Sequence, residues 1–98
     1  MTNQYLFDIT LPGELTEDFV SLIPFQRTHI DSLMVKGVVT SYGLAADRSK
    51  VWVTMRAESE ERAHEIVRSF PLYKFFTVRL YPLAFHNMTL SLTNIFMN

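Results

Sequence analysis

The residues of this 98-residue chain that could do acid–base chemistry are a few histidines, tyrosines, arginines and carboxylates. His29 stands between Arg27 and Asp31, and a histidine at the border of a cleft can transfer protons near neutral pH. The hydroxyl of Tyr42 could donate a hydrogen bond to a ligand oxygen. The alternatives are a half-exposed helical histidine and a tyrosine that packs in an interface.

Other kinds of chemistry find no support in the sequence. The chain has no cysteine, and its three histidines are far apart, so neither a thiolate nucleophile nor a metal site is predicted. It contains no glycine-rich phosphate loop, no H-E-x-x-H and no G-x-S-x-G motif. We therefore expect no cofactor and no metal.

The hydrophobic pattern predicts the elements that position these residues. Alternating apolar residues predict a strand over residues 5–11, and a helical stripe covers residues 16–36, with Thr16 as its N-cap and Pro24 causing a kink or a break. Two strands at residues 38–46 and 50–57 then form a hairpin. A second helix follows at residues 59–70 and a last strand at residues 74–83. The order β-α-β-β-α-β predicts an α+β ferredoxin-like fold with two helices on one face of a four-stranded antiparallel sheet, in the strand order 4-1-3-2.

The two faces of this sheet differ in character. The helix-covered face is apolar and collects Tyr5, Phe7, Ile9, Val51, Val53, Met55, Phe76, Val78 and Leu80. The opposite face is mixed and carries Leu6, Asp8, Thr10, Thr40, Tyr42, Trp52, Thr54, Arg56, Thr77, Arg79 and Tyr81. Such a mixture fits a surface shared with another subunit.

A charged group is predicted within that mixed face. The strand order places Asp8 between Arg79 and Arg56, with Trp52 on the same face. One interpretation is a structural ion-pair cluster inside an interface. The other is a ligand-binding or acid–base site for a small anion, since the planar fork of arginine binds carboxylates through two bonds.

Composition limits the class of protein. Hydrophobic residues make up 48% of the chain and aromatic residues 13%, which is a heavy load for one small domain and predicts self-association. The net charge of −1 argues against nucleic acid or an anionic membrane as a partner. No apolar run is long enough for a membrane span and no signal peptide is recognisable, so we expect a cytoplasmic protein. We divide it into a domain over residues 1–85 and a C-terminal arm over residues 86–98 that contacts a neighbouring subunit.

The second half of the chain resembles a known family. Residues 59–65, the step Phe70-Pro71-Leu72-Tyr73 and the segment Leu83-Ala84-Phe85-His86 are similar to the muconolactone isomerase family. The chain also resembles the YciI-like group, in His29 and in the strand from Asp47 to Val53, and that likeness offers Asp31 or Asp47 to orient the histidine. Both groups belong to the dimeric α+β barrel superfamily, which implies two subunits with their sheets pressed together, and in some members larger rings of dimers.

This resemblance implies a function as well as a fold. It implies a cofactor-free isomerase or lyase that transfers a proton on a small organic acid or lactone. For this function our candidate catalytic residues are His29 and Tyr42, and Arg56 or Arg79 would hold the anion. Residues 38–43 lack the tryptophan, arginine and histidine side chains that the isomerases carry there, so other residues must replace them. The alternative is a non-catalytic ligand-binding or oligomerisation module. A cofactor-independent monooxygenase using Trp52 is a third hypothesis from fold analogy.

Overall fold

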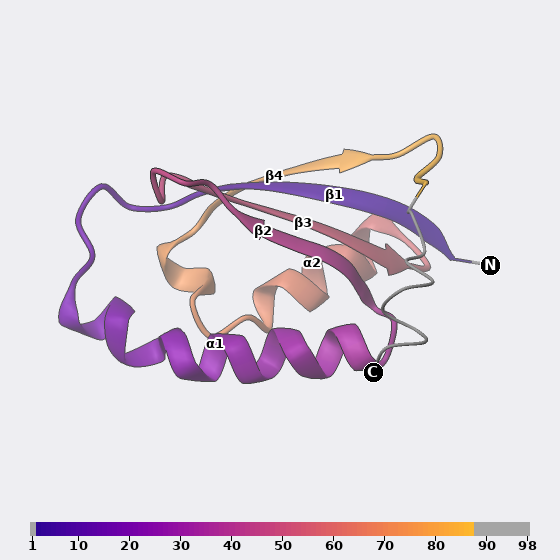
Figure 1. Ribbon diagram of the computed structural model, residues 1–98. Coiled ribbons are helices and arrows are strands. Elements are labelled where there is room, and N and C mark those ends of the chain that lie inside the picture. Colours follow the sequence, from indigo (N-terminus) through magenta and orange to yellow (C-terminus); the bar gives the residue numbers. More distant parts are fainter. Residues whose placement is uncertain (1, 88–98) are drawn as a thin grey trace, which may run out of the picture.

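A computed structural model describes residues 2–87 of the chain. The elements are β1 (Asn3–Thr10), α1 (Glu17–Val35), β2 (Val39–Leu44), β3 (Lys50–Ala57), α2 (Glu60–Arg68), the short 3-10 helix η1 (Tyr73–Phe75) and β4 (Thr77–Pro82). The strands form one sheet in the order β2-β3-β1-β4, and both helices lie on the same side of it (Figure 1). All strand pairs are antiparallel, so the predicted ferredoxin-like fold and strand order are confirmed. Most of the predicted C-terminal arm lies outside the described residues.

The core lies between the sheet and the helices. Every second side chain of β1 points into it, and Phe7 pairs with Val53 just as Tyr5 pairs with Met55. Phe7, Val53 and Met55 are 0% exposed. Burying each such side chain contributes roughly 1.5–3 kcal/mol. The predicted covered face is therefore confirmed, because each of its residues is buried or packs against the buried cluster.

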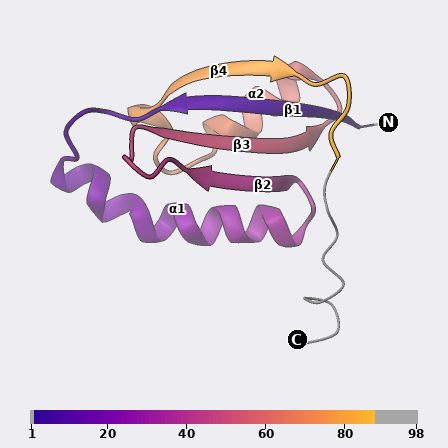
Figure 2. The same cartoon turned by 45° about the horizontal axis from the view of Figure 1, so that its top comes forward.

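Helix α1 runs through its proline without a break. Its N-cap is Thr16, whose Oγ1 accepts a hydrogen bond from the Phe19 amide at 3.2 Å, and Gly37 follows the last turn with φ +74°. Of the two outcomes predicted for Pro24, a separate short helix does not form. Figures 1 and 2 show instead that the first turns of α1 slant against the rest of the helix. Buried residues on both sides of the proline hold the two parts against the same core, which outweighs the lost hydrogen bond.

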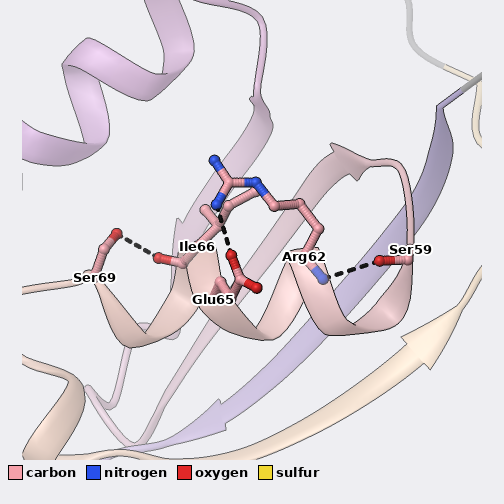
Figure 3. A network of polar contacts seen from close by, with 5 residues as sticks. All are labelled: Ser59, Arg62, Glu65, Ile66 and Ser69. Atoms are coloured by element: carbon pink, nitrogen blue, oxygen red, sulfur yellow. Dashed lines mark hydrogen bonds and ion pairs between the residues drawn. The ribbon is translucent and has the colours of Figure 1, made fainter.

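Helix α2 is fixed by polar contacts at both ends (Figure 3). Ser59 caps it by accepting from the Arg62 amide at 3.1 Å, and Arg62 Nη1 binds Glu65 Oε2 at 2.9 Å. The helix ends at Arg68, two residues earlier than the pattern predicts, and Ser69 Oγ then donates to the Ile66 carbonyl. No helix among residues 2–87 has the length and apolar character needed to cross a membrane.

Strand β2 contains an irregularity that changes which way its side chains point. The register shifts between Val39 and Ser41, so that Val39 pairs with Met55 whereas Tyr42 pairs with Val53. The extra residue reverses the alternation, as a β-bulge does. The prediction that Tyr42 lies on the mixed face of the sheet, the open face that the helices do not cover, is therefore wrong. The tyrosine shares the covered face with Val53 and packs against the core.

The open face of the sheet carries the predicted charged residues in a different arrangement. Asp8 has Arg79 opposite it on β4, as predicted, but Trp52 opposite it on β3. Arg56 lies beside Gln4 instead, so its predicted place next to Asp8 is wrong. The apolar pairs of the covered face fix the register, and this puts Lys50 within reach of Asp8, with Nζ 2.9 Å from Oδ1. Arg79 lies over the Tyr81 ring, 5.0 Å from its centre.

Candidate functional site

A cavity lies between the first half of α1 and the strands β2 and β3, on the covered side of the sheet. Its volume is about 180 Å³. Most of its wall is apolar, formed by Leu11, Leu15, Phe19, Ile23, Leu44, Val51, Leu72 and Phe76. Its polar lining comes from Gln26, Arg27, Tyr42 and Arg48. An apolar hollow with a few converging polar groups is the usual form of a small-molecule site.

A second hollow of about 340 Å³ adjoins this cavity along α1. The two share Gln26, Arg27 and Tyr42 in their linings. The second hollow adds Asp31, together with the apolar Ile30 and Met34. A tyrosine, an aspartate and an arginine thus line two neighbouring hollows.

Gln26 holds the centre of this arrangement. Gln26 is only 3% exposed, and its side-chain Oε1 accepts a hydrogen bond from the Leu72 amide at 3.1 Å. A backbone amide can only donate, so the oxygen of the glutamine must face Leu72 and its Nε2 must face Tyr42. Nε2 donates to Tyr42 Oη over 3.4 Å. Because Oη accepts this bond, the hydroxyl proton of Tyr42 is free to point elsewhere.

The environment of Tyr42 keeps that hydroxyl protonated. Burial raises its pKa above the usual value, and the hydrogen bond from Gln26 opposes this effect only in part. Since a tyrosine ordinarily titrates near pH 10, Tyr42 is neutral throughout the physiological range. A neutral phenol with an uncommitted proton can donate a hydrogen bond to an oxygen atom of a bound molecule.

Two arginines bring positive charge to the same cavity. Arg27 comes from α1 and Arg48 from the turn between β2 and β3. The ion pairs found among residues 2–87 join Lys50 to Asp8 and Arg62 to Glu65, so neither cavity arginine takes part in one. Both guanidinium groups could therefore bind an anionic group of a ligand.

His29 lies apart from both hollows. Its Nε2 is 2.9 Å from Ser69 Oγ, and its ring meets Phe70 edge-on, with ring centres 5.9 Å apart. Ser69 already donates its proton to the Ile66 carbonyl, so the imidazole N–H must be the donor to Ser69. The cleft predicted beside His29 is thus on the neighbouring face of α1, and this histidine connects α1 to the end of α2. Its catalytic role remains a prediction.

The residues predicted for the site therefore divide between the two sides of the sheet. Tyr42 lines the cavity, whereas Asp8, Trp52, Arg56 and Arg79 belong to strand positions of the open face. Sequence reasoning missed Gln26, Arg27 and Arg48 as site residues. A signal existed for Gln26, since it lies four residues before Ile30 in the buried stripe of α1, where a polar side chain needs a partner.

Metal binding finds no support in the part of the chain that the structure describes. Among residues 2–87, no three histidine, aspartate or glutamate side chains come together in a way that could hold a metal ion.

A family model described as muconolactone delta-isomerase matches residues 3–89, which is most of the chain. No curated protein matches the chain.

Proposed function

The chain belongs to the muconolactone delta-isomerase family, and from this premise we propose that it is a cofactor-free isomerase or lyase that transfers a proton on a small organic acid or lactone. The proposed site comprises the cavity between α1 and β2 and the neighbouring hollow along α1 that Asp31 lines. The observation that carries the proposal is the orientation of the Tyr42 hydroxyl, which accepts from Gln26 and keeps its own proton for a ligand.

Tyr42 would act on the oxygen of the substrate. When a C–H next to a carbonyl group loses its proton, negative charge develops on the carbonyl oxygen. A hydrogen bond from Tyr42 Oη to that oxygen stabilises the charge, and removing one such donor typically slows a reaction by about 10²–10³-fold. The largely apolar wall of the cavity strengthens this interaction because electrostatic interactions are stronger in surroundings of low polarity.

Asp31 is the proposed proton carrier. Its carboxylate would take the proton from one carbon of the substrate and return it to another, which moves a double bond without a net change of atoms. We place Asp31 before His29, which stays the alternative proton carrier, because Asp31 lines the hollow beside Tyr42, whereas the imidazole of His29 donates to Ser69. Arg27, which lines both hollows, would attract the acid to the site.

The experiment is solvent-proton exchange into muconolactone. We expect the wild-type protein in D₂O to replace carbon-bound protons of muconolactone by deuterium, which proton NMR detects. Tyr42→Phe should slow the exchange by about 10²–10³-fold, and Asp31→Asn should also slow it. The matched control is Tyr73→Phe, which removes a hydroxyl from a tyrosine outside the cavity lining.

Two outcomes would overturn the proposal. If muconolactone raises the melting temperature but wild-type exchange does not exceed that of buffer, the chain is a ligand-binding module. If Tyr42→Phe exchanges as fast as Tyr73→Phe, the tyrosine is not part of the reaction.

The open face of the sheet is the proposed contact between two subunits. Trp52 is 42% exposed and Tyr81 37% exposed there, and large aromatic side chains at such exposure are typical of interfaces. Pairing two such faces would give the barrel that the family resemblance implies. Asp8, Arg56, Arg79 and Trp52 would then line its interior, where a small anion is their proposed ligand.

A further inference from the structure

Arg48 adopts a backbone conformation that suits glycine better than arginine. Its φ is +63°, and it is the one residue other than glycine with a positive φ among residues 2–87. It lies in the turn of the β2–β3 hairpin, where its amide donates to the Ala45 carbonyl at 2.8 Å. A side chain in this left-handed region crowds the following backbone, so turns usually place glycine or asparagine there.

The contacts of the turn itself do not explain the arginine. The turn is held by Asp47, whose Oδ1 accepts from the Ser49 amide at 3.0 Å and from Ser49 Oγ at 2.6 Å. These contacts would remain with glycine at position 48. Within residues 2–87 the Arg48 side chain makes no hydrogen bond or ion pair, so the folded turn gains nothing polar from it.

The arginine does reach the cavity. Arg48 lines the cavity from the hairpin, and Arg27 lines it from α1. No aspartate or glutamate is among the described residues that line this cavity. The nearby Asp47 carboxylate is occupied by Ser49, and these hydrogen bonds lower its pKa. The cavity lining therefore includes two arginines whose guanidinium groups have no hydrogen-bond or ion-pair partner in the described chain, a setting suited to binding a carboxylate.

From this geometry we propose that Arg48 holds the carboxylate of the ligand and selects anionic over neutral ligands. The inference rests on the proposed function of the cavity and adds a specificity-determining residue to it. Arg48 supplies from the hairpin turn a positive charge that strand β2 lacks. The unfavourable backbone conformation is then retained because ligand binding depends on the side chain.

The test compares Arg48→Gly, Arg48→Asn and Arg48→Lys with the wild type. Each is titrated with muconolactone, which is anionic, and with its neutral methyl ester. The glycine and asparagine variants should bind muconolactone about 10- to 100-fold more weakly, the range expected for a lost hydrogen bond to a charged group. Their affinity for the ester should change less than about twofold, within the effect of an uncharged contact. Arg48→Lys should retain part of the preference for the anion.

Thermal melting separates this role from a structural one. Glycine and asparagine both tolerate the left-handed conformation, so neither variant should melt below the wild type. A clear fall in melting temperature in both would make Arg48 a structural residue of the turn. Unchanged muconolactone affinity in both would remove it from the binding site.

The failure of this inference and that of the proposed function are distinguishable. If Arg48→Gly binds muconolactone normally while Tyr42→Phe still slows proton exchange, only the role of Arg48 is refuted. If the wild-type protein neither binds muconolactone nor exchanges its protons, the proposed function fails, and the role of Arg48 fails with it.

Discussion

Replacing Gln26 by leucine should destabilise the protein because it removes the acceptor of the buried Leu72 amide. The substitution keeps the approximate size of a side chain that is 3% exposed but removes its polar atoms. The Leu72 amide then loses its acceptor, and Leu72 is itself only 5% exposed, so water cannot readily replace the bond. The Tyr42 hydroxyl loses its donor at the same time.

The two lost hydrogen bonds should contribute unequally to the loss of stability. A buried amide left without a partner costs about 1–3 kcal/mol. The bond to Tyr42 is longer, 3.4 Å against 3.1 Å, so we assign it less than about 0.5 kcal/mol, at the weak end for such bonds. Gln26→Leu should therefore lower the free energy of unfolding by roughly 1–3 kcal/mol. At about 4–8 °C per kcal/mol for a domain of this size, the melting temperature should fall by roughly 4–24 °C.

The assay is urea unfolding followed by circular dichroism, at one protein concentration because self-association would also change stability. Tyr42→Phe alone and the double variant complete a mutant cycle. We expect Tyr42→Phe to lose less than about 0.5 kcal/mol and the cycle to show little coupling.

A matched control uses the other buried glutamine oxygen. Gln4 Oε1 is buried without a hydrogen-bond partner among the described residues, so Gln4→Leu should cause no comparable loss. The reasoning is refuted if Gln26→Leu unfolds at the same urea concentration as the wild type, or if Gln4→Leu loses as much stability as Gln26→Leu.

Three further predictions concern other parts of the molecule. Pro24→Ala should raise the free energy of unfolding by about 2 kcal/mol. Proline inside a helix costs about 3 kcal/mol, and its restriction of the unfolded chain offsets a part of that cost. An unchanged thermal melt would show that the bent helix is not strained. Because burial raises the pKa of Tyr42, the contribution of this tyrosine to stability is complete below pH 10 and is lost as the pH rises through the raised pKa. In melts recorded at increasing pH, Tyr42→Phe should flatten this alkaline loss of stability. An identical loss in the variant and the wild type would contradict the prediction. Trp52→Lys should shift the protein toward a monomer in size-exclusion chromatography with light scattering, with an unchanged circular dichroism spectrum; a mass equal to that of the wild type would argue against the open face as the interface.

Local patterns in the sequence determined the fold. The alternation in residues 5–11 and 50–57 predicts two strands with one apolar face, and those faces are the ones that form the core. Thr16 and Ser59 mark the starts of the helices because a short polar side chain satisfies free amides there. These features depend on residues a few positions apart, so their period and chemistry can be read from the chain alone.

The site was decided by contacts between distant segments. A bulge in β2 turned Tyr42 to the covered face, and no local pattern marks that extra residue. The register of β1 against β3 gave Asp8 the partner Lys50 instead of Arg56, because apolar pairs on the covered face fixed how the strands align. The cavity itself joins α1, the hairpin turn and the segment around Leu72. The sequence by itself thus determined which elements form, whereas tertiary packing decided which side chains meet, since register and bulges depend on the summed packing of the whole sheet.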